Sequence, residues 1–241
     1  MAADLQERRR AARATRAVRA VLARAVDRRR DGRAARWRWR RAAVLQSDIV
    51  GSTRLLRAAG DDYPELLVRH RELIARAVTR RRGRFLAHAG DGTMAVFDRV
   101  DHALAAAVEA QRAIGAAPWP QDLAPRVRMG VHVGEIVEVD GEPVGLAVHH
   151  GARVMAAARP GQVLVSPDAA AAVGATGGAP AEGRATVGDG AAVAVVDAGW
   201  HVLRDHDEPV RLGQVAADGL AVEAPSGLRI DLTDRPRGVQ S

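Results

Sequence analysis

The stretches Ser47-Asp48-Ile49-Val50-Gly51-Ser52-Thr53 and Gly90-Asp91-Gly92 decide the fold of this chain. In the first, an apolar run ends in an aspartate followed by Gly-Ser-Thr, which predicts a strand that turns tightly into a helix. In the second, Gly-Asp-Gly interrupts an apolar run, which predicts a hairpin turn. If the two strands are neighbours, both aspartates lie at the same end of one sheet. Two carboxylates beside a helix N-terminus favour a site for divalent metal and phosphate.

Composition narrows the class of protein. Of the 241 residues 47% are hydrophobic but only 3% aromatic, so the core must consist of Ala, Val and Leu. The absence of cysteine excludes disulfides, thiolate zinc sites and thiol nucleophiles. All 36 basic residues are arginine. No signal-peptide pattern opens the chain and no run of about 18 apolar residues occurs, so we expect a cytoplasmic protein.

Positive charge is concentrated in residues 1–41, which hold 15 arginines against four acids, a net charge of +11. The other 200 residues hold 21 arginines and 25 acids, a net charge of −4. The apolar residues of this arm recur at helical spacing, which predicts an amphipathic helix. With Trp37 and Trp39 among its arginines, the arm could bind nucleic acid or an anionic membrane surface. The alternative is a solvated helix that leads into the following domain.

The rest of the chain mixes helical and strand patterns. We expect strands at 42–48, 84–89, 93–97, 126–133, 135–139 and 162–165, with the fourth and fifth forming a hairpin across Gly134. Short strands are expected at 191–196, 201–204 and 212–215. Helices are expected at 51–60, capped by Ser52 or Thr53, from 63 to about 82, at 101–116 and at 146–158. This order predicts an α+β fold with helices packed on a largely antiparallel sheet.

Five motifs, in this order and with these gaps, resemble the class III nucleotidyl cyclase catalytic domain, in the form of the bacterial subgroup with Val-His-x-x-Ala-Arg. They are Asp48–Thr53 (DIVGST), Gly90–Gly92 (GDG), Arg128–Glu135 (RMGVHVGE), Gly145–Arg153 (GLAVHHGAR) and Gly161–Ser166 (GQVLVS). The resemblance implies a ferredoxin-like α+β cyclase fold and a homodimer with active sites at its interface. It also implies conversion of ATP or GTP to the 3′,5′-cyclic monophosphate and pyrophosphate, with two Mg²⁺ or Mn²⁺ ions per site.

The domain organisation follows from these patterns. Residues 1–41 form the arginine-rich arm, and residues 42–175 correspond to the cyclase domain. Residues 176–190 are a Gly/Ala-rich connector. Residues 191–218 are expected to add a short β segment to the cyclase domain, because Trp200–Asp205 and Glu208–Leu212 resemble the tail of many bacterial members. Residues 219–241 are a polar tail.

The resemblance assigns a role to each matched position. Asp48 and Asp91 match the two metal-binding aspartates, and the backbone carbonyl of Ile49 is a further ligand. Carboxylate oxygen suits Mg²⁺ and Mn²⁺. The backbone amides that would hold phosphate are those of Gly51, Ser52 and Thr53.

Two positions on the helix at 146–158 match residues that act on the reacting nucleotide. Arg153 matches the arginine that stabilises negative charge developing near the α-phosphate. His149 stands where most members carry an asparagine that positions the ribose. The two positions are four apart and so share one helix face.

The purine-reading positions depart from the family. Ala87 stands where the family has a lysine that selects adenine, and Glu142 stands where it has an aspartate. Ala87 cannot donate a hydrogen bond to a purine, whereas Glu142 keeps a carboxylate. The alternatives are therefore a nucleotide cyclase, a weak or inactive regulatory and nucleotide-binding dimerisation module on the same fold, and a nucleic-acid binder acting through residues 1–41.

Overall fold

The computed structural model describes residues 38–87, 90–119, 123–176, 184–187, 191–204, 206, 208–222 and 226–230. The helix expected in the arginine-rich arm lies outside the described residues. Within the described part of the chain, no helix has both the length and the apolar character needed to cross a membrane.

The described strands join into one ten-stranded sheet whose main path runs in the order β10-β8-β9-β6-β4-β1-β3-β2. The strand β5 pairs with β4 and β7 pairs with β8, both off this path. Pairing is mostly antiparallel, with β6 parallel to β4 and β10 parallel to β8. The strands are β1 (Arg40–Ile49), β2 (Arg84–Ala87), β3 (Thr93–Phe97), β4 (Val127–Val139), β5 (Glu142–Val144), β6 (Val163–Val165), β7 (Arg184–Val187), β8 (Ala191–Val202), β9 (Val210–Ala216) and β10 (Ser226–Ile230).

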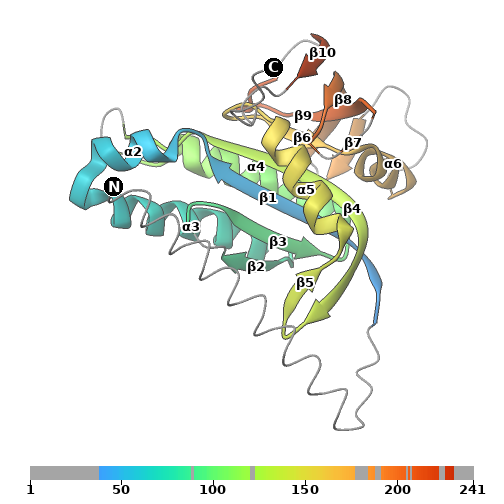
Figure 1. The fold of residues 1–241 in the computed structure, drawn as a ribbon, viewed down its shortest axis with the longest axis horizontal. Coiled ribbons are helices and arrows are strands. Elements are labelled where there is room, and N and C mark those ends of the chain that lie inside the picture. The colour runs from blue at the N-terminus through green and yellow to red at the C-terminus, as the bar shows by residue number, and fades with distance from the viewer. Residues whose placement is uncertain are drawn as a thin grey trace, which may run out of the picture. The chain divides into compact units, whose positions relative to one another are not determined.

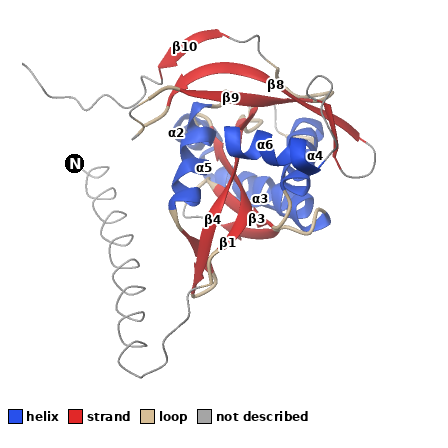
Figure 2. Ribbon diagram, turned by 90° about the vertical axis from the view of Figure 1, so that its right-hand side faces the viewer, coloured by secondary structure: helices blue, strands red, loops and turns tan. Residues whose placement is uncertain are grey.

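Helices cover both faces of the sheet. They are α2 (Ser52–Ala59), the 3₁₀ turn η1 (Gly60–Asp62), α3 (Tyr63–Arg80), α4 (Val100–Ala116), α5 (Leu146–Ala157) and α6 (Pro167–Thr176). The helices α3, α4 and α6 pack on one face and α5 packs on the other. Figures 1 and 2 show α5 and α4 on opposite sides of β1 and β4. The predicted α+β fold with helices on a largely antiparallel sheet is confirmed.

Alternation along β1 explains how one strand serves both faces, because successive side chains of a strand point in opposite directions. Ala43, Leu45 and Ile49 belong to the core cluster that includes α3, α4 and α6. Ala42 and Val44 belong to a separate cluster that includes Ala147 of α5. This assigns Asp48, which has the same parity as Ala42 and Val44, to the face covered by α5.

The hairpin predicted across Gly134 is wrong, because β4 continues through that residue. A Cβ atom at position 134 would lie 2.8 Å from Cβ of Ala147 on α5, so glycine serves close packing there. The true turn is Asp140-Gly141, where both residues have positive φ, at 54° and 81°. That geometry suits a two-residue hairpin turn between β4 and β5.

Several C-terminal expectations also needed correction. The helix α6 was not expected, and β7 lies inside the segment assigned as a flexible connector. The separate strands expected at 191–196 and 201–204 are one strand, β8, and β10 lies in the segment assigned as a polar tail. The helix α6 begins at a proline and contains four consecutive alanines, a helical signal that the expectation did not use.

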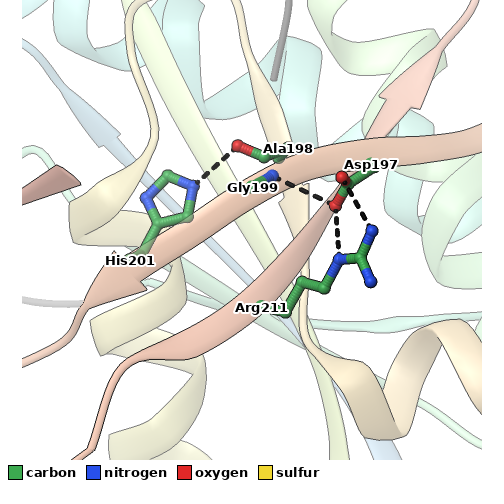
Figure 3. A network of polar contacts seen from close by, with 5 residues as sticks. All are labelled: Asp197, Ala198, Gly199, His201 and Arg211. Carbon is green, nitrogen blue, oxygen red and sulfur yellow. Dashed lines mark hydrogen bonds and ion pairs between the residues drawn. The ribbon is translucent and has the colours of Figure 1, made fainter. Parts of the chain in front are cut away.

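A bulge in β8 explains why one strand was expected to be two. The register with β9 shifts between Asp197 and Gly199. Arg211 of β9 donates to both carboxylate oxygens of Asp197, at 3.0 and 3.1 Å, and the Gly199 amide donates to Oδ1 at 3.1 Å (Figure 3). The ring of His201 contacts the Ala198 carbonyl through Nε2 at 3.2 Å. These contacts hold the extra residue in place without ending the strand.

The chain divides into two compact units. One contains residues 1–40 together with Val137–Val144, and the other contains Arg41–Ile136 and Gly145–Ser241. In the first unit, Arg40 forms an ion pair with Glu138 at 3.0 Å. Apart from Glu142, which belongs to the first unit, the site residues described next lie in the second unit.

Candidate functional site

The two aspartates lie at the same end of the antiparallel pair β1–β3. Ser47 pairs with Thr93 in the register of these strands, and their hydroxyl oxygens are 2.6 Å apart. Asp48 follows Ser47, and Asp91 precedes Thr93 by two residues. Because the strands run in opposite directions, both carboxylates occur where β1 ends and β3 begins. The sequence prediction that the two aspartates meet is supported by this register.

Asp48 is held by an arginine of the neighbouring strand β4. Nη2 and Nε of Arg128 donate to Oδ2 of Asp48 at 2.8 and 3.2 Å, and neither contact uses Oδ1. Nη1 of the same guanidinium donates to the carbonyl of Ala156 in α5 at 2.9 Å. About a quarter of each side chain is exposed, 26% for Arg128 and 25% for Asp48. The carboxylate is thus fixed while remaining accessible.

The carboxylates repel one another. Burial raises the pKa of Asp48 above its ordinary value, the hydrogen bond from Arg128 lowers it, and the charge of Asp91 raises it. Oδ2 of Asp91 is buried and has no hydrogen-bond partner among the described residues. Two neighbouring carboxylates, of which only Asp48 is paired with an arginine among the described residues, are stabilised by a bound cation.

These donors fit Mg²⁺ or Mn²⁺. Asp48 and Asp91 supply hard oxygen ligands, and the resemblance adds the backbone carbonyl of Ile49, the last residue of β1. Within the described ranges, no group of three or more His, Asp or Glu side chains is placed to hold a metal ion. Mg²⁺ commonly keeps waters and takes phosphate oxygens as its other ligands.

The helix after β1 starts differently from the prediction. The N-cap is Gly51, at φ 73° and ψ 30°, and no side chain caps the helix, so the expected cap at Ser52 or Thr53 is wrong. The amides of Arg54 and Leu55 bond back to the Gly51 carbonyl at 2.9 and 3.0 Å. The amides of Ser52 and Thr53 precede this first bonded turn, where a helix lacks internal acceptors for its N–H groups. They are therefore suited to an anionic ligand.

The predicted catalytic pair lies on α5. His149 is exposed and Arg153 is half-buried, one helical turn apart. The groups that shift the pKa of Asp48 are Arg128 and Asp91. The structure thus brings Asp48 and Asp91 together, whereas the assembly of His149 and Arg153 with them remains a prediction.

The purine-reading positions lie on two different strands. Ala87 of β2 pairs with Thr93 of β3, so Ala87, Thr93 and Ser47 form one row across three strands beside the aspartates. Glu142 is exposed on β5, opposite Val139 of β4. A longer side chain at position 87 would start from the strand next to the Asp91 turn.

Sequence reasoning missed two residues of this neighbourhood. Arg128 was quoted within a motif but received no role, although its parity opposite Val127 and Met129 places it on the face shared with Asp48. His70 of α3 lies outside all five sequence motifs. It is fully buried, and burial lowers its pKa to about 4, with the charge of Asp91 acting in the opposite direction.

Three other histidines gather near α5 and α6. The rings of His132 and His150 are 5.3 Å apart, and those of His150 and His206 are 4.7 Å apart. Nδ1 of His132 lies 2.9 Å from Oγ of Ser166. Burial, followed by the charge of His150, lowers the pKa of His132 to about 4. The three rings form one packed row, in which His132 is the buried member.

Comparison with solved structures defines the class of protein. The chain is similar to the adenylate cyclases of Trypanosoma brucei in their monomeric state, with TM-score 0.63 and 21% identity, covering 79% of this chain and 95% of that one. It is also similar to the adenylate/guanylate cyclase/hydrolase of Silicibacter pomeroyi, with TM-score 0.57 and 28% identity, covering 75% and 99%. The fold is that of the adenylate and guanylate cyclase catalytic domains. No family model matches the chain.

Sequence relatives point the same way. The chain is 30% identical to the putative adenylate cyclase 3 of Rhizobium meliloti over 192 residues, 78% of this chain and 30% of that relative. It is 30% identical to an uncharacterized protein of Mycobacterium tuberculosis over 171 residues, 69% of this chain and 52% of that relative. The chain therefore spans only part of the length of these relatives. Together with the structural neighbours, they confirm the resemblance to the class III adenylate/guanylate cyclase catalytic domain.

Proposed function

We propose that this chain is a purine nucleotide cyclase that converts ATP or GTP to the 3′,5′-cyclic monophosphate and pyrophosphate. The observation that carries the proposal is the pair Asp48 and Asp91 at the junction of β1 and β3, directly before the N-terminus of α2. The repulsion between the two carboxylates suits a divalent cation, and the N–H groups at the start of α2 that lack helix acceptors suit a phosphate chain.

The reaction forms a bond between the ribose 3′-oxygen and the α-phosphorus and breaks the bond from that phosphorus to the bridging oxygen of the departing pyrophosphate. Asp48, Asp91 and the Ile49 carbonyl would hold Mg²⁺ or Mn²⁺. Bound there, the two ions would lower the pKa of the 3′-hydroxyl and neutralise the polyphosphate. The free amides of Ser52 and Thr53, with that of Gly51, would anchor the phosphates.

The remaining roles belong to α5 in a homodimer with active sites at the interface. Arg153 would stabilise the charge that grows on the α-phosphate, and His149 would donate a hydrogen bond to the ribose. The purine would be read by Glu142 without help from Ala87. We propose that residues 42–175 and 191–218 make up the cyclase domain.

Purified protein incubated with ATP or GTP and Mn²⁺ tests the proposal, with cyclic nucleotide and pyrophosphate both measured. Asp48→Ala and Asp91→Ala should abolish product, while Asp61→Ala, which removes an exposed acid of η1, should leave it unchanged. Absence of product from either nucleotide, or its persistence in both aspartate variants, would contradict the proposal.

Ala87 favours a second candidate, a nucleotide-binding dimerisation module without turnover. Losing one hydrogen-bonding contact to a substrate costs about 1–3 kcal/mol, or roughly 10- to 200-fold in discrimination. Calorimetry with a non-cyclisable ATP analogue separates the two functions. Binding without any product from ATP or GTP would favour the module.

A further inference from the structure

His70 is a buried imidazole that the proposed mechanism does not use. It lies on the face of α3 that packs against the sheet, and its side chain has 0% exposure. Neither ring nitrogen has a hydrogen-bond partner among the described residues. Buried polar groups are nearly always paired, so an exception of this kind calls for a physical explanation.

The next residue on α3 shows where His70 lies. Nη2 of Arg71 donates a hydrogen bond to the backbone carbonyl of Gly90, which immediately precedes Asp91. The third turn of α3 is thereby attached to the turn that carries the second aspartate. In sequence, His70 directly precedes Arg71 and Asp91 directly follows Gly90, so both residues are neighbours of the two groups that form this hydrogen bond.

Asp91 lacks a hydrogen-bond donor, just as His70 lacks an acceptor, among the residues that the structure describes. Its Oδ2 is buried and has no partner among the described residues. The charge of Asp91 also raises the pKa of His70 against the larger lowering by burial, so the two groups interact. An unpaired acceptor and a ring with an unpaired N–H are therefore close enough for the charge of the first to act on the second.

We infer that His70 is a positioning residue for Asp91: its N–H donates to one water that in turn donates to Oδ2, and so orients the carboxylate for the cation. The inference rests on the proposed function. A neutral imidazole suits this role because it donates a hydrogen bond without bringing a positive charge to a cation site. Residues that orient a ligand in this way typically change metal affinity by about 10- to 100-fold.

The first test needs neither metal nor activity. Long-range ¹H–¹⁵N spectra of ¹⁵N-histidine-labelled, metal-free protein give the ring nitrogen shifts, with His70→Gln identifying the signals of His70. Asp91→Ala should move the His70 ring signals, while Asp61→Ala should leave them in place. His70 signals that do not respond to Asp91→Ala would overturn the inference, whatever the protein catalyses.

The second test measures Mn²⁺ binding by electron paramagnetic resonance. His70→Leu should weaken Mn²⁺ binding about 10- to 100-fold, and His70→Gln, which keeps an N–H donor, should recover most of the affinity. The control His102→Leu removes a half-buried histidine of α4 and should bind as the wild type does. Circular dichroism checks that each variant is folded.

The outcomes separate the inference from the proposed function. Wild-type protein that forms cyclic nucleotide, together with His70→Leu that binds Mn²⁺ normally, would overturn the inference alone. Equal loss of affinity in His70→Leu and His70→Gln would also overturn it, because the N–H donor would then be irrelevant. If the His70 ring signals respond to Asp91→Ala in a protein that makes no product, only the proposed cyclase activity would be contradicted.

Discussion

Arg128 donates two hydrogen bonds to one oxygen of Asp48, from Nη2 at 2.8 Å and Nε at 3.2 Å. Its third contact, from Nη1 to the Ala156 carbonyl at 2.9 Å, reaches the C-terminal turn of α5. A single guanidinium thus joins the end of β1 to the helix that carries Arg153. The geometry needs an arginine, because a lysine ammonium cannot address two acceptors with a rigid fork.

Removing this guanidinium should destabilise the fold. Arg128→Ala leaves a partly buried carboxylate and a helix carbonyl without their donor, which should lower the free energy of unfolding by about 1–3 kcal/mol. Urea denaturation measures the effect. The control is Arg211→Ala, which removes the exposed ion pair with Asp197 and should cost clearly less, because solvent screens that pair. Equal losses would contradict the structural role of Arg128.

Cation binding should depend on pH through Asp48. Its raised pKa means that protons compete with Mn²⁺ up to a higher pH than at an ordinary aspartate, because only the ionised carboxylate is a ligand. Arg128 lowers that pKa, so Arg128→Ala should move the midpoint of Mn²⁺ binding to still higher pH. Binding titrations at several pH values measure the midpoint, and a shift to lower pH would contradict this account.

Two buried histidines should make the fold acid-sensitive. The pKa of His70 and that of His132 are each about 4 in the folded chain, against an ordinary value of 6.5. Below pH 6.5 the unfolded chain takes up protons that the folded chain does not, so stability is full above that pH. It should fall towards pH 4 by about 1.4 kcal/mol per pH unit for each histidine. Urea unfolding across this range tests it, and His132→Asn should show a smaller slope.

The close approach of β4 to α5 should make position 130 intolerant of a side chain. A Cβ atom added at Gly130 would lie 2.3 Å from the backbone nitrogen of Met155. Gly130→Ala should therefore cost about 1–3 kcal/mol or more, through displacement of α5. Gly115→Ala, on the exposed surface of α4 with no atom nearby, should instead stabilise by about 0.5–1 kcal/mol. Thermal unfolding compares the two variants.

Restoring a purine-reading pair should raise turnover if base recognition limits it. Ala87→Lys places an ammonium on the strand beside the Asp91 turn, and Glu142→Asp restores the carboxylate length found in the family. The double variant should turn over ATP about 10- to 200-fold better relative to GTP. Steady-state assays with both nucleotides measure this ratio. An unchanged ratio would show that selection does not depend on these positions.

Local signals predicted the core of the fold well. The apolar run before Asp48 and the Gly-Asp-Gly turn mark strand ends within a few residues, so β1, β2, β3 and the meeting of the aspartates could be foreseen. Gly134 misled the prediction because a glycine that admits a packed helix and a glycine that turns the chain are identical in sequence. Only the position of Ala147 separates the two cases.

Local sequence patterns could not predict the residues that contact the two aspartates. Arg128 and Asp48 are 80 residues apart, and no local rule joins them. His70 occupies an apolar helix face, where periodicity alone reads a histidine as a polar interruption. Its importance appears only once α3 is placed over the turn that carries Asp91.

The hydroxyl contact between Ser47 and Thr93 has a consequence for folding. Successive residues of a strand point to opposite faces, so a slip of one residue between β1 and β3 would place Asp48 on the face opposite to its present neighbours on β3. The slip would thereby separate the two carboxylates. A misaligned chain could not assemble the cation site. Divalent cations should therefore stabilise only correctly paired molecules, and the ion would act as a selector of strand alignment before any nucleotide binds.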